Sequence, residues 1–361
     1  MKHNERTLTG KIMKLFFRYL SVVFAVLVLL GTFTACKKDD KSDSYDTIQN
    51  DGTINNGVTD DATTDDATTD NGAGDEKENK KIYGNVINMK SFDTTFMSFN
   101  ILNGSTYDAR WDEIASFLMR SGTSVICMQE VKKAQFDFLK EKLADKYEVV
   151  WYTRHTADGE GLATAYEKNV WTLVNEECFW LSETPDRISK DWNSKYPRIC
   201  VRTLLEHKST GAKLNVFNVH TESNIAQFEQ MKVMLERAKK SEYPVLVAGD
   251  FNTHYTTHTT VATMETYFQN CQQVARDTDL GITAHDKFKY DDYEGVPIDF
   301  CFVSKDIFDV LTFDVCRDRR TDNNSWLSDH YPIKTTVRYI YEYEIEYPDT
   351  TPDGVDGEID G

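Results

Sequence analysis

Polar side chains that can bind metal or phosphate follow apolar runs at several places in the chain. VLVAGDFN brings Asp250 and Asn252 to the end of an apolar segment, and VICMQE does the same for Glu130. Such a run is typical of a buried strand that stops at the edge of its sheet. Taken alone, Asp250 and Asn252 fit an ordinary strand-closing turn equally well. The other residues of this kind are Asn100, Asn218, His220, Asp299, Asp329 and His330.

These residue types are suited to the hydrolysis of phosphate esters. Hard divalent cations prefer oxygen ligands, commonly one or two carboxylates, with water and substrate in the remaining positions. Glu130, Asp250 and Asp329 would supply such carboxylates. An imidazole that titrates near neutrality can handle a proton, and a carboxylate partner fixes its tautomer and supports its charged form. We therefore expect Mg²⁺ as the cofactor, with Mn²⁺ able to replace it.

The elements that must position these residues alternate between strand-like and helix-like patterns from Ile82 onward. Apolar residues at helical spacing predict helices near residues 111–118, 136–143, 228–238 and 261–271. Strand-like runs precede and separate them, and several follow one another without a helix between residues 147 and 207. Two strand-rich halves with helices attached to each predict a four-layer α/β/β/α sandwich of two mixed sheets in one domain.

The motifs SFNILNG, CMQEV, NVH, GDFN, IDF and SDHYPI occur in this order. In this respect the chain resembles the endonuclease/exonuclease/phosphatase superfamily with its DNase I-like fold. Members of that superfamily include pancreatic DNase, apurinic endonucleases, bacterial sphingomyelinases, inositol polyphosphate 5-phosphatases and deadenylases. The resemblance covers about residues 93–340. FWLSETP and YPRIC are similar to a bacterial branch of it.

The resemblance implies a role for each matched residue. Glu130 would be the principal Mg²⁺ ligand, with Asn100 beside it and Asp329 completing the metal site. Asp250 and Asn252 would orient the attacking water and contact the phosphate. The remaining roles are an Asp-His pair of Asp299 and His330, a second phosphate-facing histidine at His220, and substrate-side positions at Asn218 and Tyr255.

Two assignments within the site stay open at this stage. Either His330 or Asp250 could take the proton of the attacking water; we assign Asp250 to water orientation and His330 to the phosphate or proton role. Asn218 could bind substrate or only brace the site. Departures from the superfamily pattern at Thr221-Glu222 and Gln227 concern substrate placement more than the metal site.

Both ends of the chain differ from the predicted domain at residues 82–347. Five basic residues precede a short apolar stretch that ends at Ala35-Cys36, which resembles a bacterial lipoprotein signal over residues 1–36. The resemblance implies a lipidated Cys36 and a protein of the cell envelope, on the outer membrane or cell surface. The alternatives are a simply secreted protein and an uncleaved anchor. Residues 37–81 are predicted to be a disordered acidic tether, and residues 348–361 an acidic disordered tail.

The net charge of −18 is carried largely by the tether and the tail, so the domain itself is only mildly acidic. This argues against a broad phosphate-backbone footprint. We therefore expect a monomer that acts on a small phosphorylated substrate or a phospholipid headgroup. A nuclease that cleaves DNA or RNA ranks second, and a non-catalytic surface binding protein third. The cysteine spacing indicates neither a disulfide framework nor a structural zinc site.

Overall fold

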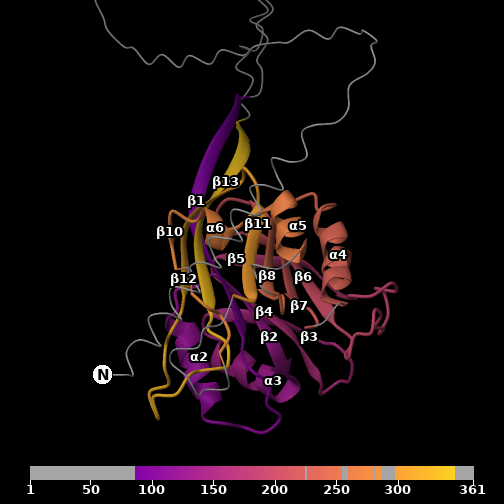
Figure 1. Ribbon diagram of the computed structural model, residues 1–361. Helices are drawn as coiled ribbons and strands as arrows, with labels where there is room; N and C mark the ends of the chain where they lie inside the picture. The colour runs from indigo at the N-terminus through magenta and orange to yellow at the C-terminus, as the bar shows by residue number, and fades with distance from the viewer. Residues whose placement is uncertain (1–85, 224–225, 254–258, 280, 286–296, 346–361) are drawn as a thin grey trace, which may run out of the picture. The chain divides into compact units, whose positions relative to one another are not determined.

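The computed structural model describes residues 86–223, 226–253, 259–279, 281–285 and 297–345 of the 361-residue chain. These residues form two β-sheets that pack face to face, with helices on the outer faces (Figure 1). The predicted four-layer α/β/β/α sandwich is confirmed.

The first sheet has seven strands in the order β10-β12-β13-β1-β2-β4-β3. Its centre is β1, which runs parallel to β2 and antiparallel to β13. This arrangement places the two ends of the domain on adjacent strands in the middle of one sheet. The strands are β1 (Val86–Asn100), β2 (Val125–Lys132), β3 (Tyr147–Thr153), β4 (Glu160–Glu167), β10 (Asp277–Thr278), β12 (Phe308–Val315) and β13 (Ile333–Ile345).

The second sheet has six strands in the order β5-β6-β7-β8-β11-β9. Its central strand β8 is buried at every position, as its continuous apolar sequence predicts. The strands are β5 (Trp171–Trp180), β6 (Ile199–His207), β7 (Lys213–His220), β8 (Val245–Asp250), β9 (Phe268–Asn270) and β11 (Asp299–Ser304).

Three apolar clusters hold the four layers together. The largest lies between the sheets and includes Phe96 and Val216. Helices α2 (Arg110–Arg120) and α3 (Lys133–Lys142) share a second cluster with the outer face of the seven-stranded sheet. Helices α4 (Ala226–Ala238) and α5 (Thr259–Tyr267) share a third with the six-stranded sheet. In α2 the predicted residues Trp111, Ile114 and Leu118 form the buried face.

The structure corrects two sequence expectations. The helix predicted over residues 261–271 ends at Tyr267, because Phe268–Asn270 pairs with β11 as strand β9. Asn270 then caps the short helix α6 (Cys271–Val274) by accepting a hydrogen bond from the backbone of Gln272. Strand β12 was not predicted as a separate element. Its alternation of apolar and polar residues is interrupted by a bulge near Val310.

The six cysteines of the described domain are free thiols, four of them fully buried. Among the described residues, no helix is long and apolar enough to cross a membrane. The predicted signal with Cys36, the tether and the acidic tail lie outside the described residues.

Candidate active site

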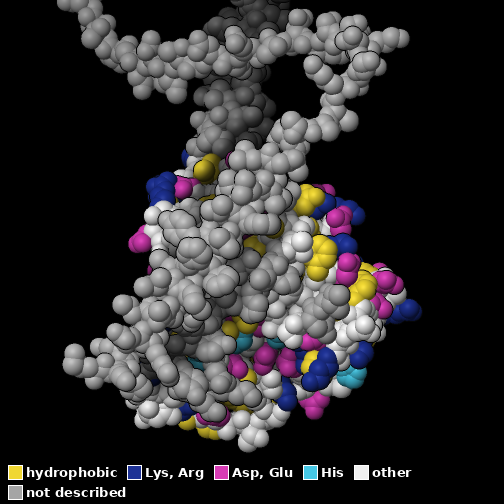
Figure 2. Space-filling model, viewed as in Figure 1, with side chains coloured by type: hydrophobic (Ala, Val, Ile, Leu, Met, Phe, Trp, Pro, Cys, Tyr) yellow, Lys and Arg dark blue, Asp and Glu magenta, His cyan; other side chains and the backbone are white. Residues whose placement is uncertain are grey.

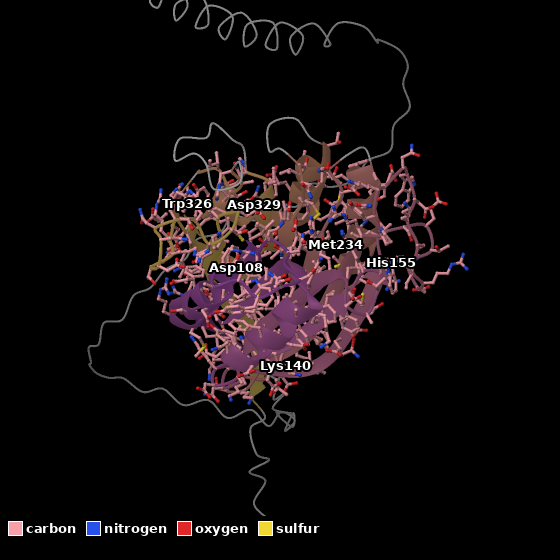
Figure 3. The ribbon with its side chains drawn as sticks, turned by 90° about the horizontal axis from the view of Figure 1, so that it is seen from below. Asp108, Lys140, His155, Met234, Trp326 and Asp329 are labelled. Atoms are coloured by element: carbon pink, nitrogen blue, oxygen red, sulfur yellow. The ribbon has the colours of Figure 1, made fainter. Side chains whose placement is uncertain are left out.

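The strand-end residues meet at one end of the domain, where the two sheets lie against each other. Asn100 ends β1 and Glu130 lies near the end of β2, both in the seven-stranded sheet. His220 and Asp250 end two strands of the other sheet, and Asp299 begins β11 directly opposite Asp250. Asp329 and His330 come from the segment before β13, and Asp329 is labelled in Figure 3. In Figure 2 acidic, histidine and basic side chains gather on the lower part of the visible face.

Asn100 joins the two halves of this site. Its Nδ2 lies 3.2 Å from Oε1 of Glu130, 3.1 Å from Oδ2 of Asp250 and 3.4 Å from Nε2 of His330. The hydroxyl of Ser328 donates to the backbone carbonyl of Asn100 at 2.7 Å. One buried carboxamide therefore contacts side chains of both sheets and of the segment before β13.

Glu130 is aimed into the site by an irregularity in β2. The pairing of β2 with β4 shifts register between Met128 and Val131, and Glu130 adopts a left-handed φ of 59°. Such a backbone costs about 1–3 kcal/mol and persists where the surroundings impose it. Burial alone would raise the pKa of Glu130, but hydrogen bonds from Asn103 and Asn100 outweigh it and hold the pKa below the ordinary value.

The pKa of Asp329 shifts in the opposite direction to that of Glu130. Burial raises its pKa, His330 lowers it, and the neighbouring charge of Glu130 raises it again, so that the net shift is upward. The charges of these two carboxylates therefore act on each other within the site. A divalent cation prefers such oxygen ligands.

His330 lies between two buried carboxylates. Its Nδ1 is 2.9 Å from Oδ2 of Asp299, and its Nε2 is 3.8 Å from Oδ2 of Asp250. Burial disfavours the charged imidazole, but Asp299 and Asp250 outweigh this effect and raise the pKa of His330. Burial likewise raises the pKa of Asp250. The predicted Asp-His pair is thus present as a hydrogen-bonded contact.

Two groups of side chains in this site could hold a cation. Asp250, Asp299 and His330 each offer one ligand atom, and these atoms lie within 4.8 Å of one another. In that group, however, the Asp299–His330 hydrogen bond already engages one atom of each partner. Glu130 and Asp329 form the second group, and their carboxylate oxygens fit a hard cation better.

His220 and Asn252 complete the side of the site that belongs to the six-stranded sheet. Nε2 of His220 lies 3.4 Å from Oδ2 of Asp250. Burial, followed by the charges of Arg198 and Arg154, lowers the pKa of His220 well below its usual range and favours the neutral imidazole. Asn252 has a φ of 47°, donates its backbone N–H to Oδ1 of Asp250 at 2.8 Å, and anchors its side chain on the Thr221 carbonyl at 3.0 Å.

Asn218 is fully buried between the sheets. Its Nδ2 donates to the backbone carbonyls of Met128 and Ala163, and its Oδ1 accepts from Nε2 of Gln129 at 3.0 Å. Its carboxamide therefore braces the sheets and does not make the substrate contact that we expected. Tyr255 lies outside the described residues.

A model of the Endonuclease/Exonuclease/phosphatase family matches residues 97–330. The chain belongs to this family. No curated protein matches the chain.

Solved structures give the same picture. A family member from Bacteroides thetaiotaomicron is 26% identical with a TM-score of 0.64, over 69% of this chain and 99% of that chain. The mannosyl-6-phosphatase of the same organism is 26% identical with a TM-score of 0.60, over 68% of this chain and 99% of that chain. TDP2 of D. rerio, complexed with a single-strand DNA product, is 17% identical with a TM-score of 0.57, over 68% of this chain and 98% of that chain. The last similarity shows the fold alone.

Three arginines near the site of this family member were not assigned a functional role from the sequence. Arg110 is buried and donates to the backbone carbonyls of Leu102 and Leu327, which ties the segment after β1 to the segment before β13. Arg154 and Arg198 bring positive charge close to His220. Of the three, Arg198 lies in the motif YPRIC, which marks it in the sequence.

Proposed function

We propose that this family member is a metal-dependent phosphoester hydrolase. The observation that carries the proposal is the convergence of Glu130, Asp329, Asp250 and the imidazoles of His220 and His330 at the end where the sheets meet. Asn100 contacts Glu130, Asp250 and His330 at 3.1–3.4 Å, so these groups are held together before any ligand binds. Preorganised groups of this kind are what phosphoryl transfer requires of a protein.

In this proposal Glu130 and Asp329 hold Mg²⁺, with Asn100 beside them and Mn²⁺ able to replace it. The donor set consists of oxygens, as hard cations require. The bound cation would stabilise the negative charge that develops on the phosphoryl oxygens.

The protein's own groups divide the remaining work. Asp250, fixed by the backbone N–H of Asn252, orients the attacking water. The side-chain amide of Asn252 contacts the phosphate through the N–H that is not bonded to the Thr221 carbonyl. His220, kept neutral by burial, donates a hydrogen bond to a phosphoryl oxygen. His330, whose charged form is favoured by the two neighbouring carboxylates, contacts the phosphate, and Asp299 holds its ring in place.

We propose a small phosphorylated molecule as the substrate and the bacterial cell envelope as the location. The 26% identity to a mannosyl-6-phosphatase supports a phosphorylated carbohydrate. The mildly acidic domain supports a small substrate over a long polyanion. The basic segment, apolar stretch and Ala35-Cys36 of the N-terminal sequence support a lipid anchor at Cys36.

A single substitution tests the proposed metal site. Glu130→Ala removes the carboxylate and should reduce hydrolysis of p-nitrophenyl phosphate or bis(p-nitrophenyl) phosphate. The loss should exceed the roughly 10–100-fold typical of groups that only support a ligand. Activity of the unchanged protein should depend on added Mg²⁺ or Mn²⁺ and disappear with a chelator.

Glu141→Ala is the matched control, because Glu141 is exposed on α3. Calorimetric titration with Mg²⁺ should show binding to the control and none to Glu130→Ala. Equal activity in the two variants would remove the proposed metal mechanism.

A further inference from the structure

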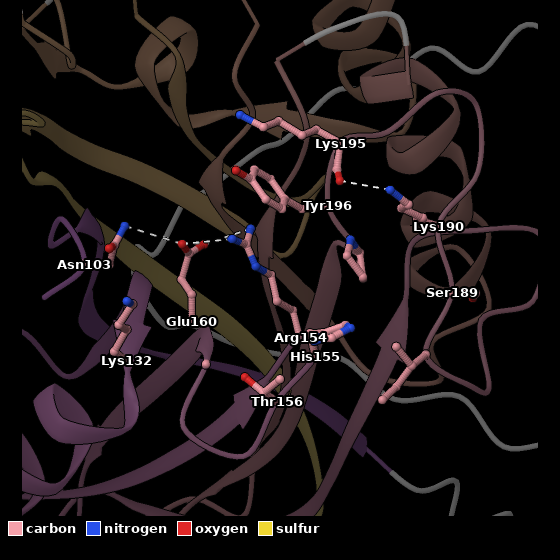
Figure 4. Close-up of a pocket in the computed structure, with 13 residues that line it drawn as sticks. Asn103, Lys132, Arg154, His155, Thr156, Glu160, Ser189, Lys190, Lys195 and Tyr196 are labelled. Atoms are coloured by element: carbon pink, nitrogen blue, oxygen red, sulfur yellow. Dashed lines mark hydrogen bonds and ion pairs between the residues drawn. The ribbon is translucent and has the colours of Figure 1, made fainter. Parts of the chain in front are cut away.

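A cavity of about 710 Å³ opens beside the active site, and its walls carry three lysines and one arginine against a single carboxylate (Figure 4). It is formed by the end of β2, the turn between β3 and β4, and the segment between β5 and β6. A volume of this size suits a small molecule. The side chains relevant here are Asn103, Lys132, Arg154, Lys190, Lys195 and Tyr196.

The wall of the cavity is joined to the proposed metal site by a short chain of contacts. Nδ2 of Asn103 lies 2.7 Å from Oε2 of Glu130 and 3.4 Å from Oε2 of Glu160. Glu160 in turn pairs with Arg154 at 2.9 Å and 3.0 Å. Arg154 also lines a smaller cavity together with His220. A substrate whose phosphate lies between Glu130 and His220 would therefore extend its remaining part into the larger cavity.

The three lysines supply positive charge that the cavity does not itself neutralise. Lys132 donates to the hydroxyl of Ser105 at 2.7 Å, Lys190 donates to the backbone carbonyl of Lys195 at 3.1 Å, and the ammonium of Lys195 lies 5.0 Å from the ring centre of Tyr196. In the described part of the chain, no carboxylate lies within 4.0 Å of these ammonium groups. Such lysines are common phosphate ligands.

The wall that carries Lys195 and Tyr196 is held in place before a ligand binds. The buried carboxylate of Glu222 accepts the backbone N–H of Lys195 at 3.1 Å and that of Tyr196 at 3.3 Å, and it pairs with Arg198 at 3.4 Å. The guanidinium of Arg154 lies 4.5 Å from the centre of the Tyr196 ring. Preorganisation of this kind reduces the entropic cost of binding.

We propose that this cavity binds a second phosphate group on the part of the substrate that leaves, so that the enzyme prefers small molecules with two phosphates. The inference rests on the proposed hydrolase function. Water would attack the phosphate at the metal site, the ester P–O bond would break, and the alcohol oxygen would take a proton. Inorganic phosphate and an alcohol that keeps its second phosphate would be the products. The partly exposed Tyr196 ring beside the lysines suits the carbon skeleton between the two groups.

The first test compares two probes, mannose 6-phosphate and mannose 1,6-bisphosphate, with the full-length protein and Mg²⁺. kcat/KM should be at least about tenfold higher for the bisphosphate. The double substitution Lys190→Gln with Lys195→Gln should bring this ratio close to one, mainly through KM, and the rate with the monophosphate should fall less. The matched control is Lys168→Gln with Lys208→Gln, which removes two lysine charges at the opposite end of β4 and β6 and should keep the ratio. A ratio near one in the unchanged protein, or the same ratio in both double variants, would overturn the proposal.

The second test measures binding without turnover. Calorimetry in the presence of a chelator should show mannose 1,6-bisphosphate binding to the unchanged and control proteins, with Kd at least about tenfold higher in the Lys190 and Lys195 variant. Lysine-dependent binding without hydrolysis of either probe would support the cavity and refute the proposed function. Hydrolysis of the probes together with a Kd that is the same in the Lys190 and Lys195 variant would support the proposed function and refute the role of the cavity. Tighter lysine-dependent binding of a single-stranded oligonucleotide than of the bisphosphate would replace the small molecule by a nucleic acid and overturn the proposal.

Discussion

The contact between Asp299 and His330 offers the sharpest test of how the site works. Asp299 is 2% exposed, and its Oδ2 lies 2.9 Å from Nδ1 of His330. Asp299→Asn keeps the shape of the side chain and removes its charge. Because Asp299 acts through His330 and does not reach the substrate itself, we expect kcat to fall while the affinity for Mg²⁺ stays the same.

The size of the loss follows from the nature of the hydrogen bond. A hydrogen bond to a charged group contributes about 1.5–3 kcal/mol. If His330 needs this bond in the transition state, each ~1.4 kcal/mol lowers the rate tenfold. We therefore expect kcat/KM of Asp299→Asn to fall about 10- to 150-fold. The free energy of unfolding should fall by about 1–3 kcal/mol, because the hydrogen bond to a charged group is weakened. The loss should stay this small because the amide still fills the buried position.

The assay compares the unchanged protein, Asp299→Asn and the exposed-site control Asp145→Asn. Steady-state hydrolysis of p-nitrophenyl phosphate gives kcat and KM, calorimetry gives Mg²⁺ affinity, and urea denaturation gives stability. A folded Asp299→Asn protein with kcat/KM within twofold of the control would show that Asp299 does not support His330 in the reaction. Loss of Mg²⁺ binding in this variant would instead move Asp299 into the metal site.

Two further predictions concern the scaffold. In Gly249→Ala a Cβ would lie 1.9 Å from the backbone oxygen of Val219, so we expect a large loss of stability, measured by thermal unfolding; an unchanged melting temperature would contradict this. Burial lowers the pKa of His207, whose ring stacks on Phe92 at 3.9 Å and packs against Trp171. The neutral ring is therefore favoured, and its contribution to stability is complete above the unfolded pKa of about 6.5 and is lost as pH falls. His207→Gln should reduce the dependence of the unfolding free energy on pH between about pH 7 and 5, and an identical dependence in both proteins would refute the assignment.

The sequence predicted the layers, and it predicted that the polar residues at the strand ends lie together, because both depend on local patterns. Continuous apolar runs such as β8 identify buried strands, and the polar residue after each run marks the strand end. Because those ends meet at one edge of the sandwich, Asp250 could be placed near Asn100 although they are 150 residues apart.

Other features depend on tertiary contacts that no local pattern encodes. The left-handed backbone of Glu130 arises where the register of β2 shifts against β4. Asn218 looked like a site residue by type, but its buried side chain bonds to groups of the opposite sheet. The ion pair of Arg154 with Glu160 depends on a turn between two strands, and the helix predicted beyond Tyr267 gives way to pairing with β11.

The pairing of β1 with β13 has a consequence for the synthesis of this protein. Val86 pairs with Ile345. The middle of the seven-stranded sheet is therefore incomplete until the last strand of the domain has been synthesised and has paired with the first. His330 precedes β13 by only a few residues, so a ribosome must release nearly the whole domain before the catalytic groups can assemble. Contacts this distant in sequence slow folding. The groups of the site therefore come together only after β13 has been synthesised and has paired with β1.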